Sequence, residues 1–373
     1  MKRLLKSSST RGHGVRIICV IFATLLTAAC SEGTAPTPVP APDESSPVTW
    51  KLSDGVEYPT GRLLTRSEDG VMLPDGSLIV ADQKYGLVEI NTAGQVRAFG
   101  QFEDANYSHN PPVTEGGPNG VHFTYDRSGV LTADVFSGAI YKTSIAEEKT
   151  ILVYSHDYGV NTAKEDSTGA VWFTQSTQNL GEERLFKAIA KPIPDGVLYR
   201  LQPGAAGFEK PTPTLVVGEL NFANGFYIDE QRNKFYLSET LANRVLVFDL
   251  DVVTGTLSNR AILAAIPSPD NMDLNYDGTL WVASPLSNQI HKIDLDTGTV
   301  GVVFDAQTEL GAIALTEGLR RVEAGDGIAD LLGSETIGKM PGLLTGMILG
   351  SEKDPFYVAN LGAALIKISP TTE

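Results

Sequence analysis

The chain has 373 residues, of which 42% are hydrophobic and 37 are glycine, a composition typical of a soluble globular protein. Its formal net charge of −16 at pH 7 disfavours nucleic acid as a partner, because a phosphate backbone would repel it. The length could hold two average domains, but all-β propellers of this size often fold as one unit, so length alone does not divide the chain.

Residues 1–30 have the features of a secretory signal peptide. The basic residues Lys2, Arg3, Lys6, Arg11 and Arg16 open the segment, and residues 15–26 are nearly all apolar. An apolar run of about a dozen residues is too short to cross a bilayer, which takes roughly 20 residues. Removal of the segment would change the formal charge from −16 to −21, since it takes away five positive charges and no negative one.

The end of this segment predicts a lipid anchor. Small residues before Cys30 in "TAAC" resemble the lipobox of bacterial lipoproteins, although Thr27 stands where leucine is commoner. We therefore expect an exported protein of the bacterial cell envelope whose only membrane contact is lipid on Cys30. Ser31 in the next position favours an outer-membrane lipoprotein that faces the periplasm or the exterior. The alternative is a signal peptide in which Cys30 is incidental.

The segment after the signal predicts a solvated tether. Residues 31–48 are mostly proline, serine, threonine and acidic residues, with almost nothing to bury. No cysteine follows Cys30, so the remaining chain, residues 49–373, must be stable without disulfides and needs a large hydrophobic core.

A two-strand pattern recurs in this remaining chain. Each copy has a polar or glycine turn, a short apolar strand, a small polar break and a second strand that alternates apolar with polar residues. The copies cover residues 73–91, 126–144, 167–177 with 195–203, 231–251, 276–296 and 352–370. Blades packed around an axis can bury faces that a single ribbon cannot. The pattern predicts an all-β fold, a six-bladed β-propeller, in preference to a sandwich of unrelated hairpins.

Two longer gaps between the copies predict excursions from the blades. The middle of residues 178–194 favours a helical turn. Residues 314–344 are expected to form a loop and a short helix over one face of the propeller.

Carboxylate or carboxamide residues precede five successive copies at nearly the same point. They are Glu68, Asn119, Asn161, Asn224 and the pair Asp270 and Asn271. The innermost strand of each blade lines the central tunnel, so residues at its mouth converge from different blades. An isolated Asn-Gly pair such as Asn224-Gly225 is more often a tight turn. The phased set instead predicts an oxygen-ligand site for a hard cation, with Ca²⁺ ahead of Mg²⁺ or Mn²⁺.

The stretches "SEDGVMLPDG", "FANGFYIDE" and "PDNMDLNYDGTLWVA" resemble the superfamily of paraoxonases, gluconolactonases, senescence marker proteins and strictosidine synthases. These are calcium-dependent six-bladed propellers, and the resemblance covers residues 50–370. It implies a tunnel Ca²⁺ held by Glu68, Asn161, Asn224, Asp270 and Asn271. In related lactonases the last-blade aspartate also acts as general base, which implies the same double role for Asp270.

Two departures from that superfamily bear on the chemistry. Asn119 stands where paraoxonases have a histidine. His122, three residues on, is either a substitute base or a surface or satisfied-core histidine without a catalytic role. Strictosidine synthase relies on a glutamate of its last blades. The glutamates Glu317, Glu323 and Glu335 lie in the long gap between copies and are expected to be solvated instead. We also expect Asn119, His122 and Phe226 to contact substrate, although Phe226, like Phe123 and Trp172, could belong to ordinary blade core.

The sequence thus predicts a calcium-dependent hydrolase of a lactone or similar ester, of lactonase or arylesterase type, with a small molecule as its partner. The cation would polarise the carbonyl group and water would be the nucleophile. The alternative is a non-catalytic propeller that binds a ligand or a protein and uses calcium only for structure, since a fold does not imply a function.

Overall fold

The computed structural model describes residues 48–178, 182–203 and 212–369. The predicted signal peptide, Cys30 and nearly all of the predicted tether lie outside these residues. No helix among the described residues has the length and apolar character needed to cross a membrane.

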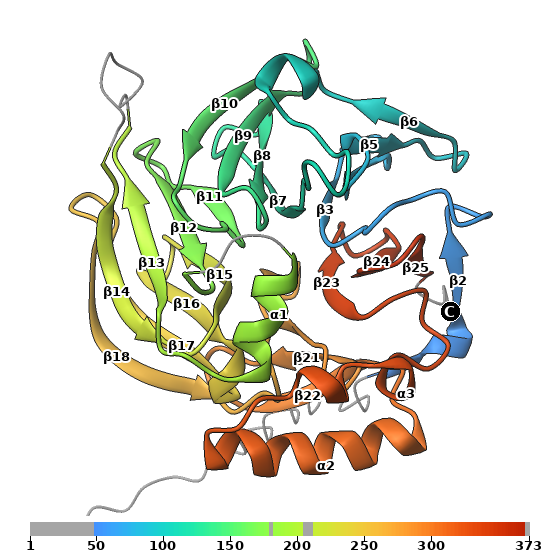
Figure 1. Cartoon of the computed structure of the whole chain (residues 1–373), viewed down its shortest axis with the longest axis vertical. Coiled ribbons are helices and arrows are strands. Elements are labelled where there is room, and N and C mark those ends of the chain that lie inside the picture. The colour runs from blue at the N-terminus through green and yellow to red at the C-terminus, as the bar shows by residue number, and fades with distance from the viewer. Residues whose placement is uncertain (1–47, 179–181, 204–211, 370–373) are drawn as a thin grey trace, which may run out of the picture. The chain divides into compact units, whose positions relative to one another are not determined.

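Six antiparallel sheets stand around a central axis, so the predicted six-bladed β-propeller is confirmed (Figure 1). The first blade contains β3 (Gly70–Met72), β4 (Leu78–Asp82), β5 (Gly86–Ile90) and β6 (Val96–Phe99). The second contains β7 (Pro118–Phe123), β8 (Gly129–Asp134), β9 (Ala139–Ser144) and β10 (Thr150–Ser155). The third contains β11 (Ala163–Glu165), β12 (Val171–Gln175), β13 (Gly196–Leu201) and β14 (Thr214–Leu220).

The fourth blade contains β15 (Ala223–Asp229), β16 (Lys234–Glu239), β17 (Arg244–Asp251) and β18 (Thr256–Ala264). The fifth contains β19 (Met272–Leu274), β20 (Leu280–Ser284), β21 (Gln289–Ile293) and β22 (Val300–Asp305). The sixth contains β23 (Leu344–Ile348), β24 (Phe356–Asn360), β25 (Leu365–Ile368) and β2 (Gly55–Tyr58). The last blade therefore joins the two ends of the described chain, because β2 pairs with β25. The short strand β1 (Trp50–Lys51) adds to the fifth blade by parallel pairing with β22.

The recurrent two-strand pattern corresponds to the second and third strands of each blade. Second strands such as β4, β12, β20 and β24 are buried at every position, because neighbouring blades cover both faces. Full burial explains why they read as short apolar runs. The core consists of hydrophobic clusters that lie between adjacent blades, for example one around Phe304 and Val358 and another around Phe235 and Trp172.

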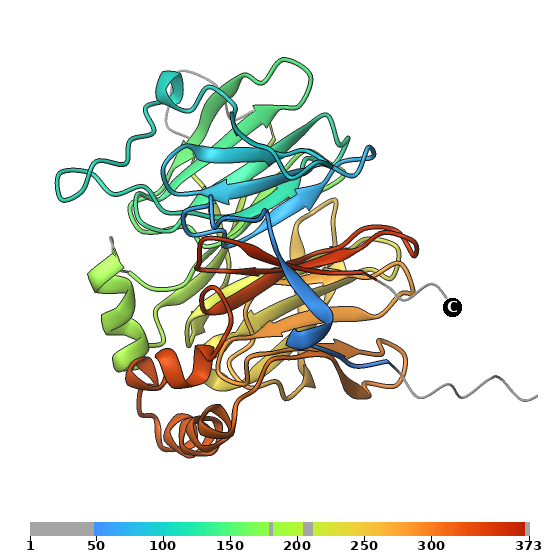
Figure 2. The same ribbon diagram turned by 90° about the vertical axis from the view of Figure 1, so that its right-hand side faces the viewer.

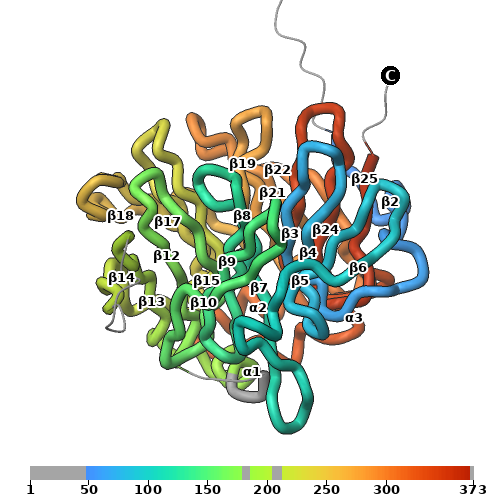
Figure 3. Tube along the Cα trace, turned by 90° about the horizontal axis from the view of Figure 1, so that it is seen from above, coloured from blue at the N-terminus to red at the C-terminus, as the bar shows by residue number. Residues whose placement is uncertain are grey.

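Helices gather on the face of the disc where the innermost strands begin (Figures 2 and 3). Helix α1 (Glu182–Ala190) confirms the helical turn expected within residues 178–194, and α2 (Glu309–Ala324) is longer than the short helix expected after residue 314. A 3-10 turn, η4 (Ala329–Leu331), and α3 (Ser334–Ile337) follow α2. A hydrophobic cluster of Leu241, Leu286 and Ile328, with Leu185 of α1 and Leu315 of α2, holds this helical cap on blades four and five.

Candidate metal centre

The residues predicted to converge do lie together at one end of the tunnel. Each stands at or directly before the start of an innermost strand, and each is nearly fully buried. Their exposed fractions are 2% for Glu68, 2% for Asn119, 5% for Asn161, 3% for Asn224, 7% for Asp270 and 3% for Asn271. Blades around an axis bring the first residues of their inner strands to a common point, which is why residues 68 and 271 meet.

The Asn-Gly pairs in this set are not hairpin turns. Asn119-Gly120 lies inside β7 and Asn224-Gly225 inside β15. A Cβ atom on Gly225 would stand 2.6 Å from the Cα atom of Asn271 on the next blade. Glycine therefore follows asparagine here because two inner strands approach closely, and the asparagine side chain is left to face its neighbours in the tunnel.

Glu68 is held by one oxygen and leaves the other without a partner. The side-chain amides of Asn119 and Asn271 each donate a hydrogen bond to Glu68 Oε1, both at 3.0 Å. Glu68 Oε2 is buried and has no hydrogen-bond partner among the described residues. A buried carboxylate oxygen without a donor costs free energy, so this atom is a candidate cation ligand.

Asn224 shows the same division between its two side-chain atoms. Its amide nitrogen donates to Thr240 Oγ1 at 3.1 Å and also forms a hydrogen bond with the Asp270 carboxylate. Its oxygen, Oδ1, is buried and finds no hydrogen-bond partner in the described chain. The fold thus fixes the donor side of the amide and leaves the acceptor side for a ligand.

The remaining amides complete a connected network. Thr162 Oγ1 donates to Asn161 Oδ1 at 3.1 Å and to Asn271 Oδ1 at 3.3 Å. Asn119 has both side-chain atoms engaged, because its oxygen accepts from Arg66 at 2.8 Å while its nitrogen donates to Glu68 and to the Asn161 carbonyl. Asn119 therefore positions Glu68, and its oxygen already accepts from the positively charged guanidinium of Arg66.

The electrostatics of the cluster call for a positive charge. Burial, followed by the nearby Asp270, raises the pKa of Glu68 to about 8. Burial also raises the pKa of Asp270 to about 8, although a hydrogen bond from Asn224 opposes this rise. Two carboxylates that share a buried space resist ionisation unless a cation compensates them.

These residues fit a hard divalent cation. Within the part of the chain that the structure describes, no group of three or more His, Cys, Asp or Glu side chains could hold a metal ion. A cation in the tunnel would therefore need amide oxygens beside the carboxylates of Glu68 and Asp270. Neutral and charged oxygens in such a mixture are the ligands that Ca²⁺ takes.

Two of the residues expected to contact substrate lie elsewhere. His122 lies three residues after Asn119, with its ring nitrogen 3.5 Å from Asp69, and lines a cavity toward the opposite end of the tunnel. Phe226, for which the alternative was ordinary blade core, lies in the core between blades, where its side chain is 0% exposed and stacks on Phe235. Trp172 belongs to the same core cluster, which a β-strand with both faces covered requires.

The sequence did not reveal three further residues of this site. Thr345 takes the corresponding position in the sixth blade, where its hydroxyl donates to the Glu68 carbonyl at 2.9 Å. Arg66 reaches across to the second blade, and Thr162 joins two asparagines. A search restricted to carboxylates and amides could not find them. One signal was present for Thr345, because it is followed by a glycine in the sixth inner strand, "LTGMI", as the asparagines are in the Asn-Gly pairs.

Comparisons with known proteins find related folds for most of the chain and a matching family sequence for part of it. Residues 153–310 match the family model described as the SMP-30/Gluconolactonase/LRE-like region, a range that includes Asn161, Asn224, Asp270 and Asn271 but not Glu68. Regucalcin from Danio rerio is 31% identical over 110 residues, which are 28% of this chain and 35% of the regucalcin. Regucalcin from Oryctolagus cuniculus is 31% identical over 84 residues, 21% of this chain and 28% of that protein. The matches span about a third of these relatives' length.

Solved structures extend the similarity to most of the chain. A gluconolactonase from Xanthomonas campestris superposes with a TM-score of 0.55 at 15% identity, over 83% of this chain and 87% of that one. A calcium-binding regucalcin from Agrobacterium tumefaciens gives 0.54 at 14% identity, over 86% of this chain and 95% of its own. At these identities the likeness establishes the propeller fold.

Proposed function

The chain contains an SMP-30/gluconolactonase/LRE-like region within a six-bladed propeller, and from this premise we propose that it is a lactonase-type hydrolase dependent on a divalent cation, preferably calcium. The observation that carries the proposal is the pair of buried oxygens, Glu68 Oε2 and Asn224 Oδ1, that have no hydrogen-bond partner in the described tunnel. The structural neighbours include a protein named as a gluconolactonase and one named as a calcium-binding regucalcin, which supports both the lactonase and the calcium parts of the proposal.

Side-chain oxygens of Glu68, Asn161, Asn224, Asp270 and Asn271 would hold the cation. When bound, it would polarise the carbonyl group of a lactone or ester and stabilise the negative charge that develops on its oxygen. The amide nitrogens of Asn119 and Asn271 keep the Glu68 carboxylate oriented by its other oxygen.

Asp270 is the candidate general base. It is the second carboxylate of the centre and, unlike Glu68, it is not clamped by two amides on one oxygen. Asn224 orients it by a hydrogen bond, so it can accept the proton of an attacking water molecule while the carbonyl carbon is attacked. General-base assistance of this kind contributes roughly 10²–10⁴-fold in rate.

The test combines metal analysis with a hydrolysis screen. Elemental analysis of the purified protein should find about one equivalent of calcium. A panel of lactones and aryl esters should include substrates whose hydrolysis stops with chelator and returns with calcium. Hydrolysis that is indifferent to chelator would contradict the proposal.

A binding propeller with structural calcium is the second candidate function, and the helical cap favours it. The cap packs beside the candidate centre, since Leu241 follows Thr240, the hydrogen-bond partner of Asn224. Such a cover restricts the approach of substrate from that face. Bound calcium without chelator-sensitive turnover on any ester would support this candidate.

We also propose that the protein is exported and carries lipid on Cys30, on the sequence features of residues 1–30. Mass spectrometry of the N-terminal peptide from the native host tests this. A peptide that begins before Cys30, or one that begins at Cys30 without added lipid mass, would contradict it.

A further inference from the structure

The innermost strands carry a second ring of inward residues, three positions after the first. The first ring holds Glu68, Asn119, Asn161, Asn224, Asp270 and Thr345. The second ring holds Val71, His122, Lys164, Tyr227, Asp273 and Ile348, all of which line one cavity of about 690 Å³. β-bulges in β7 and β15, between residues 118 and 121 and between 223 and 226, let side chains three apart face the tunnel.

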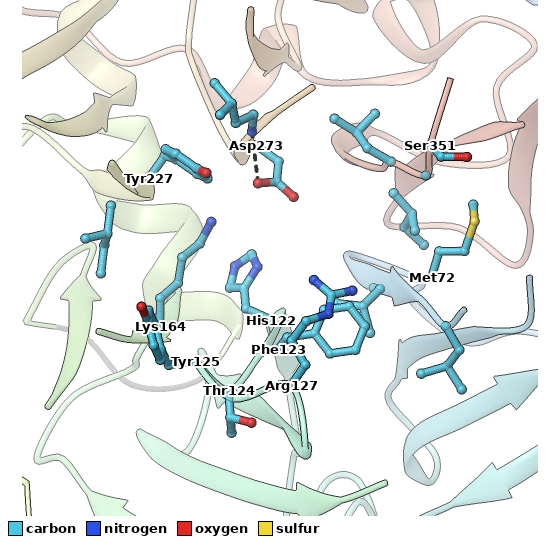
Figure 4. A pocket seen from close by; sticks show the side chains of 18 of the residues that line it. Met72, His122, Phe123, Thr124, Tyr125, Arg127, Lys164, Tyr227, Asp273 and Ser351 are labelled. Atoms are coloured by element: carbon cyan, nitrogen blue, oxygen red, sulfur yellow. Dashed lines mark hydrogen bonds between the residues drawn. The ribbon is translucent and has the colours of Figure 1, made fainter. Parts of the chain in front are cut away.

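This cavity lies toward the other end of the inner strands and is open among the hairpins that follow them. Figure 4 shows His122, Lys164, Arg127 and Asp273 pointing into it. Its volume is within the range of about 300–1,000 Å³ that is usual for small-molecule sites. Most of its polar residues come from blades two to five, and Ser351 and Asp354 come from blade six. Leu73 and Leu349, on blades one and six, give it an apolar side.

Two cations reach the cavity without a carboxylate partner. Among the described residues, no carboxylate oxygen lies within 4.0 Å of the Lys164 amine or the Arg127 guanidinium. Lys164 contacts the Met272 carbonyl oxygen at 3.5 Å and lies 5.4 Å from the centre of the Tyr227 ring, and Arg127 stacks over Phe123 at 3.9 Å. Burial lowers the pKa of Lys164, although the charges of Asp273 and Asp69, both farther than 4.0 Å, act in the opposite direction.

The acidic residues of the cavity, in contrast, are mostly engaged. Glu165 pairs with Lys142 at 3.6 Å, Asp229 with Arg232 at 3.1 Å, and Glu230 accepts from the Ser167 backbone at 2.8 Å. In a chain with 45 acidic and 29 basic residues, counter-charges for cations are abundant. Within the described chain, Lys164 and Arg127 therefore face the cavity without an ion pair of their own, and both are placed to contact an anionic ligand.

We propose that this cavity is a second binding site, which takes a small amphipathic carboxylate of the hydroxy-acid class. Lys164 and Arg127 bind the carboxylate, since both are donors that favour anions. Tyr227 and Asp273 hydrogen-bond a hydroxyl group, and the partly exposed Leu73 and Leu349 contact the hydrocarbon part. Lactone hydrolysis releases this class of compound, but the binding site stands on the cavity alone and does not require turnover.

The experiment measures binding of 6-hydroxyhexanoate to the full-length protein by isothermal titration calorimetry. Chelator is present throughout, so that the candidate metal centre and any hydrolysis take no part. We expect saturable binding with a dissociation constant at or below about 10 mM. The uncharged analogue 1,6-hexanediol should bind at least tenfold more weakly, because it lacks the carboxylate.

Variants locate the site. Lys164→Met keeps the length of the side chain and removes its charge, and it should weaken 6-hydroxyhexanoate binding about tenfold or more, as expected for a lost charged hydrogen bond. Arg127→Gln should weaken it in the same direction while the backbone turn remains. The matched control is Lys353→Met, which removes the same charge from an exposed residue beside the cavity and should leave binding unchanged.

Three results would overturn the proposal. They are the lack of saturable binding to the wild type, equal affinity for the acid and the diol, or equal affinity of wild type and both cavity variants. Circular dichroism and thermal melts of each variant show that it is folded before binding is measured. Chelator-sensitive hydrolysis is assayed separately, so failure of this site and failure of the proposed function remain distinguishable.

Discussion

At the scale of single residues, the candidate centre depends on amides that are held by their nitrogen atoms. Asn224 and Glu68 each have one polar atom satisfied by the protein and one without a partner in the described tunnel. A side chain fixed in this way is preorganised, because the cation does not have to order it. Asn119 and Arg66 act one step further out, since they orient Glu68.

Ligand and base can be separated at Asp270 and Glu68. Asp270→Asn keeps an oxygen at nearly the same place, so calcium should still bind, more weakly, while a loss of roughly 10²–10⁴-fold in turnover should persist at saturating calcium. Glu68→Gln removes charge from the centre without touching the candidate base, so added calcium should restore much of its activity. The measurement is turnover against calcium concentration. Full rescue of Asp270→Asn would reduce Asp270 to a ligand only.

The contact between blades four and five should be intolerant of a single methyl group. Gly225→Ala places a Cβ atom 2.6 Å from Asn271 Cα and 2.9 Å from the Asp270 carbonyl, both backbone atoms. Overpacking of this kind costs about 1–3 kcal/mol or more, and it should also weaken calcium binding because Asp270 and Asn271 shift. Gly218→Ala is the control, since its Cβ would meet only Leu215 at an ordinary 3.7 Å. The measurement is the free energy of unfolding in denaturant of both variants and of the wild type. Equal values for Gly225→Ala and Gly218→Ala would contradict the close contact between blades four and five.

At the scale of elements, the sequence revealed strands according to how completely they are buried. The second and third strands of each blade were predicted because burial of the second strand leaves a short, mainly apolar run, and partial burial of the third leaves an alternation of apolar and polar residues. Outer strands such as β18, in which most residues are exposed, have no such constraint and left no readable pattern. Innermost strands of three residues, such as β19 and β11, are too short for a periodicity to show.

The candidate site was predictable for a related reason. Its acidic and amide residues stand at the same point of five of the six repeated elements, so their positions could be compared without knowing the fold. Thr345 and Arg66 are neither acidic nor amide residues, so this comparison of repeated positions did not single them out. Their roles follow from packing between blades, which pairs residues 277 positions apart in sequence.

The strand β21 contains a buried histidine that should make stability depend on pH. Burial lowers the pKa of His291 to about 4, from an ordinary 6.5. Between these values the unfolded chain binds the proton and the folded chain does not, so the free energy of unfolding rises with pH across that window. The contribution is fully present above pH 6.5 and is lost as the pH falls toward 4.

His291→Gln should remove this dependence. The measurement is the free energy of unfolding of wild type and variant between pH 7 and about pH 5, where the slope of the variant should be smaller. The comparison of slopes is independent of any constant loss that the substitution causes. Carboxylates whose pKa is lowered act on both proteins alike, so they cancel. Parallel curves would contradict a neutral His291 in the folded state.

At the scale of the whole molecule, the ring is closed by a strand from the beginning of the described chain. The described residues belong to one compact unit, and within it β2 is the outermost strand of the blade that contains β23, β24 and β25. Residues 50–58 also add aromatic contacts, Trp50 with Phe356 and Tyr58 with Tyr357. Closure therefore attaches the beginning of the described chain to the last blade by hydrogen bonds and by aromatic packing.

Truncation at two nearby points should separate the predicted tether from the closing strand. A chain that begins at residue 48 retains every described strand and should melt at the temperature of the longer protein. A chain that begins at residue 60 loses β1 and β2, with the burial of Trp50 and Tyr58, so its free energy of unfolding should fall by at least about 3 kcal/mol. It should also self-associate, because β25 becomes an exposed edge strand. Calorimetry and sedimentation of both chains provide the measurement. If the shorter chain proves as stable and as monomeric as the longer one, then the pairing of β2 with β25 does not stabilise the ring. The closed ring would then depend on contacts between the inner strands alone.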